Sequence, residues 1–210
     1  ITSSQGLNTY YIRCNDSFGN TMTSSALIIF EVDSISPTAP SLISPANDSY
    51  INHTPTFSWG ASSDAVNYTI NITNSTGDTV NYSAINTTTF TPQSLSEDIY
   101  NWKVRATDDA SNTGSWSQTW QFIIDTSAPL LLSPQPNSNQ TSRTFLVSVN
   151  GSETGLICKY DTNNVGYDSM AYLLTDLNTN IYQSSLTVSL DGTYTIYFSC
   201  QDKSKNTGTN

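Results

Sequence analysis

The sequence predicts an all-β protein built from tandem β-sandwich domains of about ninety residues each, with no sustained helix. Two observations support this prediction. A strand followed by an Asp-x-x-x-Asn turn occurs three times, in residues 8–20, 100–112 and 194–206. Elsewhere, short runs alternate apolar and polar residues and are separated by turn residues, which is typical of strands. The recurrence of one pattern indicates repeated domains.

The three copies of this pattern define the period of the repeat. Aligned on Cys14, Ala106 and Cys200, they lie 92 and 94 residues apart, which is the length of a whole domain. The chain then divides into the C-terminal strands of a preceding domain (1–33), a complete sandwich (34–125) and a sandwich that lacks its last strand (126–210). We expect that missing strand just past Asn210.

The opening segment carries two predicted strands, 10–14 and 26–32, separated by a polar turn. It leads into an Asp-x-x-x-Pro segment at 33–37, and a matching segment occurs at 125–129. Because proline extends the chain and ends strand pairing, we expect both segments to be short, stiff linkers between domains.

The two following domains share a plan of short strands. The predicted strands of the middle domain are 41–44, 57–59, 66–73, 79–84, 87–91, 100–106 and 116–124, and those of the last domain are 130–132, 144–149, 156–160, 184–188 and 194–200. Seven short strands in one domain of this length predict a β-sandwich.

Composition argues against several partners. The net charge is −10, and the nearest approach to a basic cluster is Lys203 with Lys205. Because binding to a phosphate backbone needs clustered Lys or Arg, we do not expect a nucleic acid as partner. No apolar run approaches the roughly 20 residues of a membrane span, so we expect no span in this segment.

Asn-x-Ser/Thr sequons indicate the compartment. Seven of them fall between residues 47 and 86, and Asn67 and Asn71 are predicted to share one strand face with Thr69. Chance is the alternative explanation, since Asn, Ser and Thr are abundant. The candidate N-glycosylation sites are Asn15, Asn47, Asn52, Asn67, Asn71, Asn74, Asn81, Asn86, Asn139 and Asn150. Together with the cysteines, they predict an extracellular location with covalent glycans.

One stretch of the middle domain carries a family resemblance. It reads Leu95-x-x-x-Ile99-Tyr100-x-Trp102-x-Val104-x-Ala106-x-Asp108, and it is followed by Asn112, Trp116, Trp120 and Ile124-Asp125-x-x-x-Pro129. This resembles the immunoglobulin-like (Ig-like) and fibronectin type III-like repeats of large prokaryotic, especially archaeal, surface proteins. Trp59 matches their core tryptophan and Tyr100 their tyrosine corner. The resemblance implies the fold, whereas such repeats serve as spacers, adhesin stalks, filament subunits and accessory modules.

The resemblance also implies a disulfide. Cys158 and Cys200 fall on the third and sixth strands of the last domain, which are neighbours in such sandwiches, and an oxidising location favours a bridge between them. Cys14 corresponds to Cys200, so its partner is expected outside this chain. The middle domain has Ala106 at that position and relies on Trp59 instead.

Calcium is a weaker hypothesis. The Asp-x-x-x-Asn turns, with linker aspartates beside them, offer oxygen ligands, and the candidates are Asp33, Asp108 and Asp125. Calcium needs six to eight oxygens, however, and each turn supplies one or two carboxylates. An aspartate that closes its own backbone turn explains the pattern, so we predict no metal and no cofactor.

We predict that the segment is not an enzyme. His53, the only histidine, has no nucleophilic partner at a family spacing, and the acidic residues are dispersed. The favoured function is a structural repeat of a long glycosylated surface protein, acting as a stalk, fibre or adhesin shaft, with neighbouring Ig-like domains as partners.

Two alternatives remain open. One is a carbohydrate-binding or accessory module of a secreted hydrolase, which needs Trp116, Trp120 and Tyr82 exposed together on one face. The other is a homopolymeric filament built by strand donation, in which residues 24–33 of one subunit complete the last domain of the next.

Overall fold

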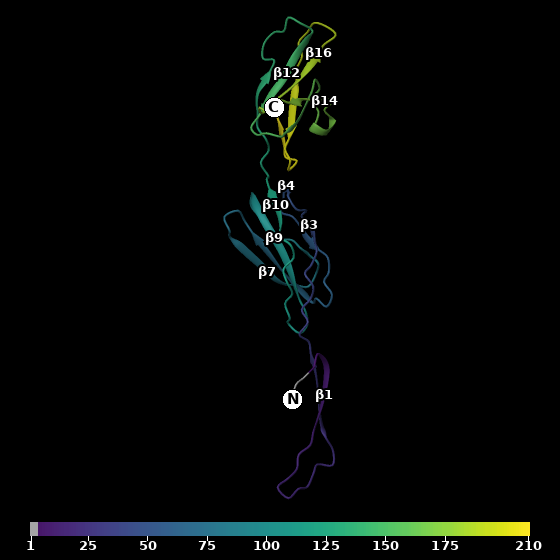
Figure 1. Ribbon diagram of the computed structural model, residues 1–210. Coiled ribbons are helices and arrows are strands. Elements are labelled where there is room, and N and C mark those ends of the chain that lie inside the picture. The colour runs from purple at the N-terminus through teal and green to yellow at the C-terminus, as the bar shows by residue number, and fades with distance from the viewer. Residues whose placement is uncertain (1–3) are drawn as a thin grey trace.

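A computed structural model describes residues 4–210. It shows three bodies in single file: a two-stranded ribbon at the N-terminal end, a middle sandwich and a last sandwich (Figure 1). The first three residues of the opening segment lie outside the described part. The described residues form strands and one 3-10 turn, η1 (Tyr167–Ser169), and none of their helices is long and apolar enough to cross a membrane.

The ribbon consists of β1 (Gly6–Ile12) and β2 (Ala26–Val32), which pair antiparallel along their whole lengths. The second strand lies where the sequence predicts it. The first is displaced toward the N-terminus, because pairing with β2 fixes its register and leaves Cys14 in the turn beyond. Apolar side chains are exposed on this ribbon, with Leu7 at 71% and Phe18 at 89% exposure.

The middle sandwich packs a five-stranded sheet, in the order β4-β10-β9-β6-β7, against a three-stranded sheet, β3-β5-β8. Its strands are β3 (Leu42–Ser44), β4 (Ser49–Ile51), β5 (Phe57–Trp59), β6 (Asn67–Thr73), β7 (Thr79–Ile85), β8 (Thr89–Phe90), β9 (Asp98–Thr107) and β10 (Trp120–Ile124). Residues of β6 and β9 alternate between buried and half-buried, as the period of two predicts. The core centres on Trp102 and Phe57, whose rings meet edge to face at 4.9 Å.

Two features of the middle sandwich differ from the sequence prediction. β4 was not predicted, because its three residues follow Pro45 and Asp48, which read as a turn, and its partner β10 pairs with it in parallel from far along the chain. The strand predicted from residue 116 begins only at Trp120. Long-range pairing, which local pattern does not show, decides both boundaries.

The last sandwich packs the sheet β11-β12-β16-β15 against the sheet β14-β13-β17-β18. Its strands are β11 (Leu131–Gln135), β12 (Thr144–Gly151), β13 (Ile157–Asp161), β14 (Tyr172–Leu173), β15 (Thr175–Asp176), β16 (Ile181–Thr187), β17 (Tyr197–Gln201) and β18 (Thr207–Thr209). Val147, Val149 and Tyr182 are fully buried in its core. The middle and the last domain are therefore both two-layered β-sandwiches.

The short strands β14, β15 and β18 were not predicted. β18 matches residues 113–115 of the middle sandwich, where an isolated bridge joins Thr107 to Thr113, so it is distinct from the last strand predicted past Asn210; residues 207–209 pair with β17. The reason is the turn between Asp202 and Asn206, which reverses the chain and brings the following residues directly beside β17.

Candidate functional site at the domain junctions

The first junction joins the ribbon to the middle sandwich through residues 33–37. From the ribbon, Gln5 Oε1 accepts hydrogen bonds from Ser34 N (3.0 Å) and Ser34 Oγ (2.9 Å), and Gln5 Nε2 donates to Asp33 Oδ1 (2.7 Å). From the sandwich, Asn112 Nδ2 donates to the Asp33 carbonyl oxygen at 3.1 Å. Both neighbours therefore bind the linker.

The second junction repeats this arrangement between the two sandwiches. Glu97, which occupies the place of the glutamine one repeat later, accepts hydrogen bonds through Oε1 from Thr126 N (2.7 Å), Thr126 Oγ1 (2.5 Å) and Ser127 Oγ (2.9 Å). From the other side, Asn206 Nδ2 donates to the Asp125 carbonyl oxygen at 2.8 Å. The same two-sided attachment is thus made with a carboxylate in place of an amide.

The Asp-x-x-x-Asn turns orient the asparagines of both junctions. Asp108 accepts Asn112 N at 2.8 Å and Asn112 Nδ2 at 3.0 Å, and Asp202 accepts the matching two groups of Asn206 at 2.9 Å each. An asparagine amide has two N–H donors. One donor is fixed by the aspartate of the turn, so that the other reaches the linker carbonyl.

A glycine lies under each linker. Gly114 and Gly208 each follow the junction asparagine by two residues, and both are buried. A Cβ on Gly114 would collide with the carbonyl oxygen of Pro37, and a Cβ on Gly208 would collide with that of Pro129. The absence of a side chain at these positions lets the linker backbone cross the strand at close range.

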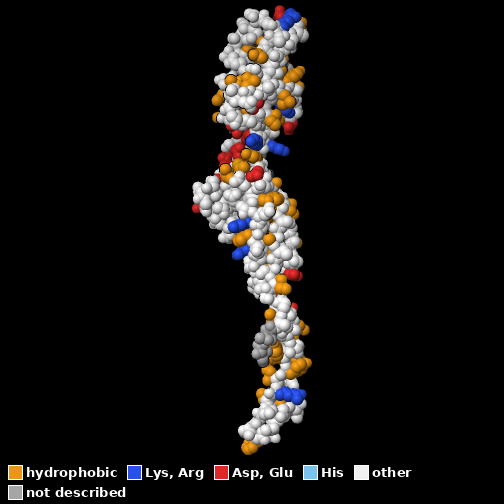
Figure 2. Space-filling model, in the orientation of Figure 1, with side chains coloured by type: hydrophobic (Ala, Val, Ile, Leu, Met, Phe, Trp, Pro, Cys, Tyr) orange, Lys and Arg blue, Asp and Glu red, His pale blue; other side chains and the backbone are white. Residues whose placement is uncertain are grey.

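Acidic side chains gather where the two sandwiches meet (Figure 2). The hydroxyl of Thr126, followed by its backbone N–H, holds the pKa of Glu97 below its ordinary value. The pKa of Glu153 is raised, first by burial and then by the nearby negative charges of Asp202 and Asp125. On acidification, Glu153 is therefore protonated before Glu97.

The three calcium candidates lie at two separate places. Asp33 and Asp108 border the first junction, and Asp125 belongs to the second. The N–H of Ile35 is the main cause of the lowered pKa of Asp33. The carboxylate of Asp108 accepts hydrogen bonds from Asn112. Within residues 4–210, no three His, Cys, Asp or Glu side chains are close enough together to hold a metal ion.

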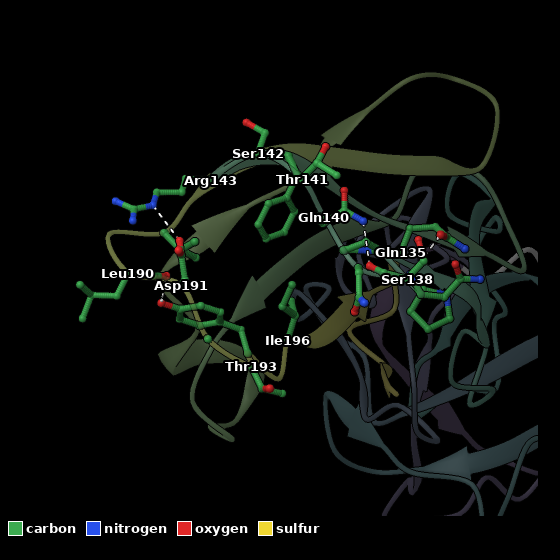
Figure 3. A pocket seen from close by; sticks show the side chains of 18 of the residues that line it. Gln135, Ser138, Gln140, Thr141, Ser142, Arg143, Leu190, Asp191, Thr193 and Ile196 are labelled. Atoms are coloured by element: carbon green, nitrogen blue, oxygen red, sulfur yellow. Dashed lines mark hydrogen bonds and ion pairs between the residues drawn. The ribbon is translucent and has the colours of Figure 1, made fainter.

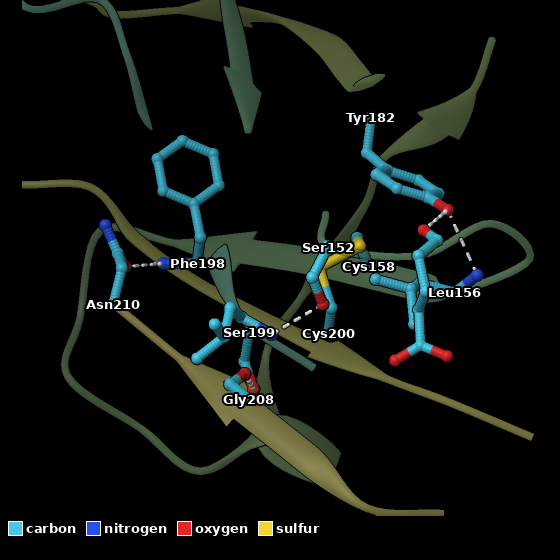
Figure 4. Close-up of a disulfide and its surroundings, with 11 residues drawn as sticks. Ser152, Leu156, Cys158, Tyr182, Phe198, Ser199, Cys200, Gly208 and Asn210 are labelled. Atoms are coloured by element: carbon cyan, nitrogen blue, oxygen red, sulfur yellow. Dashed lines mark hydrogen bonds between the residues drawn. A yellow bond between two sulfur atoms is a disulfide. The ribbon is translucent and has the colours of Figure 1, made fainter. Parts of the chain in front are cut away.

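Cys158 and Cys200 form a disulfide in the core of the last sandwich (Figure 4). They face each other across β13 and β17 with their Cα atoms 4.0 Å apart, and both are almost completely buried. Cys14 is exposed beyond the end of β1 and is a free thiol among the described residues.

None of the ten sequon asparagines is buried. Asn71 and Asn81 are paired across β6 and β7, where Asn71 Nδ2 donates to Asn81 Oδ1 at 2.9 Å. Residues Asn67 and Asn71 take the non-buried positions of the alternating β6, so they share the outer face of the five-stranded sheet. The exposed sites are Asn15, Asn47, Asn52, Asn81, Asn86 and Asn139, and the half-buried ones are Asn67, Asn71, Asn74 and Asn150.

The three rings of the carbohydrate hypothesis do not form one exposed platform. Tyr82 and Trp120 are half-buried and pack against the core of the middle sandwich. Trp116 is also half-buried, and Lys103 Nζ and Arg105 Cζ lie 5.0 and 4.6 Å from its ring centroid. The geometry therefore gives no support to a stacking surface for sugars.

A groove opens at the far end of the last sandwich, between residues 134–143 and 190–196 (Figure 3). Its volume is about 840 Å³, and Phe145 and Phe198 lie in its wall. The groove adjoins the segment that precedes β17, which begins at Tyr197 although the sequence predicts a strand from residue 194. In the middle sandwich, the corresponding edge of β9 is paired with β10.

A comparison with protein-family models points to the same fold for the middle sandwich. Residues 43–126 match the model of a bacterial Ig-like domain family. Similar solved structures include the chicken CNTN1 FN1–FN3 domains (14% identity, covering 96% of this chain and 76% of that one, TM-score 0.44) and the Clostridium thermocellum CbhA fibronectin(III)-like modules (11%, 81% and 90%, TM-score 0.49). A tetra-tandem repeat from the extending region of a large adhesion protein is also similar (18%, 98% and 55%, TM-score 0.34). No curated protein matches the sequence.

Sequence reasoning identified the linkers and the turns but missed their contacts. Gln5 and Glu97 were overlooked as linker contacts, although they stand 92 residues apart like the two linkers themselves. Gly114 and Gly208 were overlooked as well. Comparing the copies position by position, rather than each motif alone, would have found all four residues.

Proposed function

We propose that this chain is a spacer segment of a long, glycosylated extracellular surface protein of a prokaryote, acting as a stalk, a fibre or the shaft of an adhesin. One observation carries the proposal: the domains follow one another in single file, and each linker is hydrogen-bonded to the domains on both sides (Figure 1). Such an arrangement extends the chain while limiting how the domains swing.

The surface chemistry supports an extracellular location. A disulfide persists in an oxidising compartment, and ten sequon asparagines with accessible side chains suit N-glycosylation. Glycans on the outer face of β6 and β7 would cover one sheet of the middle sandwich and shield it from proteases. The resemblance to archaeal repeats favours an archaeal source.

The proposed role is not catalytic. Ig-like and fibronectin type III-like domains are typically non-catalytic structural or binding modules, and the carboxylates of Asp16 and Glu97, whose pKa values are lowered, bind a turn and a linker. A carbohydrate-binding role has no exposed aromatic platform to support it. The spacer role uses the features that recur in the chain, namely its turns, linkers and glycines.

Immunolabelling of intact cells tests the proposal. Antibodies against this chain are expected to label unpermeabilised cells of the source organism, and external protease is expected to remove the label. Glycopeptide mass spectrometry of the native protein should find sugar on sequons such as Asn81, with Asn163, which is not in a sequon, as the internal control. Labelling only after permeabilisation would refute the extracellular location.

A second candidate function is a filament joined by strand donation, and the groove beside Phe198 is the observation that favours it. In that arrangement, β2 of a second copy would pair with residues 192–197, as β10 pairs with β9. A synthetic peptide of residues 24–33 should then bind the chain, and a control peptide with Ile28→Asn and Phe30→Asn should not. Equal binding of both peptides, or of neither, would eliminate strand donation by this segment.

A further inference from the structure

We propose that the Asn-Thr-Gly sequences at residues 112–114 and 206–208 are linker seats. Each seat is a docking surface whose partner is an extended Asp-x-x-x-Pro segment of the preceding domain. This proposal rests on the spacer function and adds the part of the surface that sets how neighbouring domains are oriented.

The evidence is that two independent seats are occupied in the same way. In each seat the asparagine amide binds the carbonyl oxygen of the linker aspartate, at 3.1 Å for Asn112 and 2.8 Å for Asn206. In each seat the glycine lies against the carbonyl of the linker proline. Two contacts spaced along one extended segment fix both its position and its direction.

The glycine is the selective element of the seat. Its close neighbour is a backbone carbonyl, which cannot move aside as a flexible side chain can. The φ angle of Gly208 lies outside the left-handed region, so its backbone would accept another residue. Close approach of the linker, and not backbone conformation, therefore requires glycine here.

The first copy of the turn has the asparagine but not the glycine. Asn20 binds Asp16 as the other asparagines bind their aspartates, with 2.9 and 2.7 Å contacts. Met22 takes the place of the glycine in the same register, since Met22 N donates to Cys14 O as Gly114 N donates to Ala106 O. The Cβ of Met22 would occupy the path of a linker carbonyl, so this turn does not fit an Asp-x-x-x-Pro segment.

This difference predicts that joints in such a protein come in two kinds. Domains whose turn ends in Asn-Thr-Gly hold the preceding domain in one orientation, whereas a domain whose turn ends in Asn-Thr-Met leaves the preceding linker unseated. The exposed Phe18 and Met22 at the tip of the ribbon replace the small Ala110 and Gly114 of the middle domain. A seated joint is stiff, and an unseated joint is a hinge.

Pulsed dipolar spectroscopy on the whole chain tests the proposal. Spin labels at Ser83→Cys and Ser185→Cys, in a Cys14→Ser background, report the separation of the two sandwiches, since both serines are exposed. The parent chain is expected to give a single narrow distance peak. Gly208→Ala, which adds only a Cβ, and Gly208→Met, which copies the first turn, are expected to lose that peak.

Thr209→Ala is the matched control, because it changes an exposed residue next to Gly208 in the same strand. It should keep the narrow peak. Hydrogen exchange of the β13 and β17 amides checks that the sandwich is folded. A narrow peak in both Gly208 variants would overturn the proposal, and so would loss of core protection in Gly208→Ala, because the glycine would then serve the sandwich and not the joint. Failure of cell-surface labelling would refute the extracellular location alone.

Discussion

In the middle sandwich Tyr68 faces Ala106 across β6 and β9, whereas in the last sandwich Cys158 faces Cys200 across β13 and β17. The two pairs occupy matching places in the repeat. Beside Tyr68, the ring of Trp59 packs edge to face at a centroid distance of 5.5 Å. Aromatic bulk in one domain therefore takes the place of a covalent bond in the other.

The two solutions act on different states of the chain. Buried rings stabilise the folded state by removing apolar surface from water. A disulfide acts mainly by restricting the unfolded chain, in the loop-entropy description. Reducing agents should therefore leave the stability of the middle sandwich unchanged and should lower the stability of the last sandwich.

The largest expected effect is that of Trp102→Ala. Trp102 is fully buried against Phe57 and Trp120, so its truncation should lower the free energy of unfolding of the middle sandwich by about 3–5 kcal/mol. Urea denaturation followed by tryptophan fluorescence measures this directly, because all four tryptophans lie in the middle sandwich. Trp116→Ala, at a half-buried ring, is the control and should cost much less. Equal losses in the two variants would contradict a core that centres on Trp102.

The paired substitution Cys158→Ala and Cys200→Ala should come next in size. The bridge closes a loop with a sequence separation of 42 residues, which corresponds to about 4 kcal/mol of stability in the last sandwich. Hydrogen exchange of the β13 and β17 amides should speed up, and the fluorescence transition of the middle sandwich should stay in place. A shift of both transitions would show that the two domains unfold together.

The tyrosine corners give a smaller and graded effect. Tyr100 Oη donates to Ser96 O at 3.1 Å, and Tyr194 Oη donates to Leu190 O at 2.9 Å. Tyr100 is 6% exposed and Tyr194 is 41% exposed. Tyr100→Phe should therefore cost about 1 kcal/mol, because its partner oxygen loses a hydrogen bond in a dry place, whereas water can replace the bond lost in Tyr194→Phe. Chemical denaturation of each variant measures the difference, and a larger loss for Tyr194→Phe would contradict this reasoning.

The difference between local sequence pattern and long-range strand pairing explains which strands the sequence could predict. β2 and β6 lie where the sequence places them, because β2 is a continuous apolar run and β6 alternates apolar and polar residues over its seven positions. β4 and β18 are three residues long and exist only because a distant strand pairs with them. Periodicity cannot show such strands, since three residues do not establish a period.

The candidate site shows the same limit at the level of side chains. The sequence revealed the linkers and the Asp-x-x-x-Asn turns, because both repeat as motifs. It did not reveal that Asn112 and Asn206 reach the linkers, since that contact joins residues 79 and 81 positions apart. The backbone turn explains why each motif has an aspartate. The second N–H donor of the asparagine amide, which the turn does not use, was the signal that could have indicated a contact with the linker.

The smallest expected effect distinguishes the two junctions by pH. The pKa of Glu97 is lowered by its hydrogen bonds with Thr126, so this contact is complete above the ordinary glutamate pKa and is lost as the pH falls through the lowered value. Gln5 makes the matching contact in the first junction and does not titrate. Glu153 works in the opposite sense, since its raised pKa means that it is protonated first on acidification, which relieves repulsion with Asp125 and Asp202.

Acid titration followed by the amide resonances of Thr126 and Ser34 measures this difference. On acidification, the Thr126 resonance should shift with an apparent pKa below that of an ordinary glutamate, and the Ser34 resonance should show no step from Gln5. Asp33 titrates beside Ser34 with a lowered pKa of its own, so Asp33→Asn provides the background for the first junction. Glu97→Gln should abolish the step at Thr126. A step that persists in Glu97→Gln would contradict the assignment of the titration to the Glu97 carboxylate.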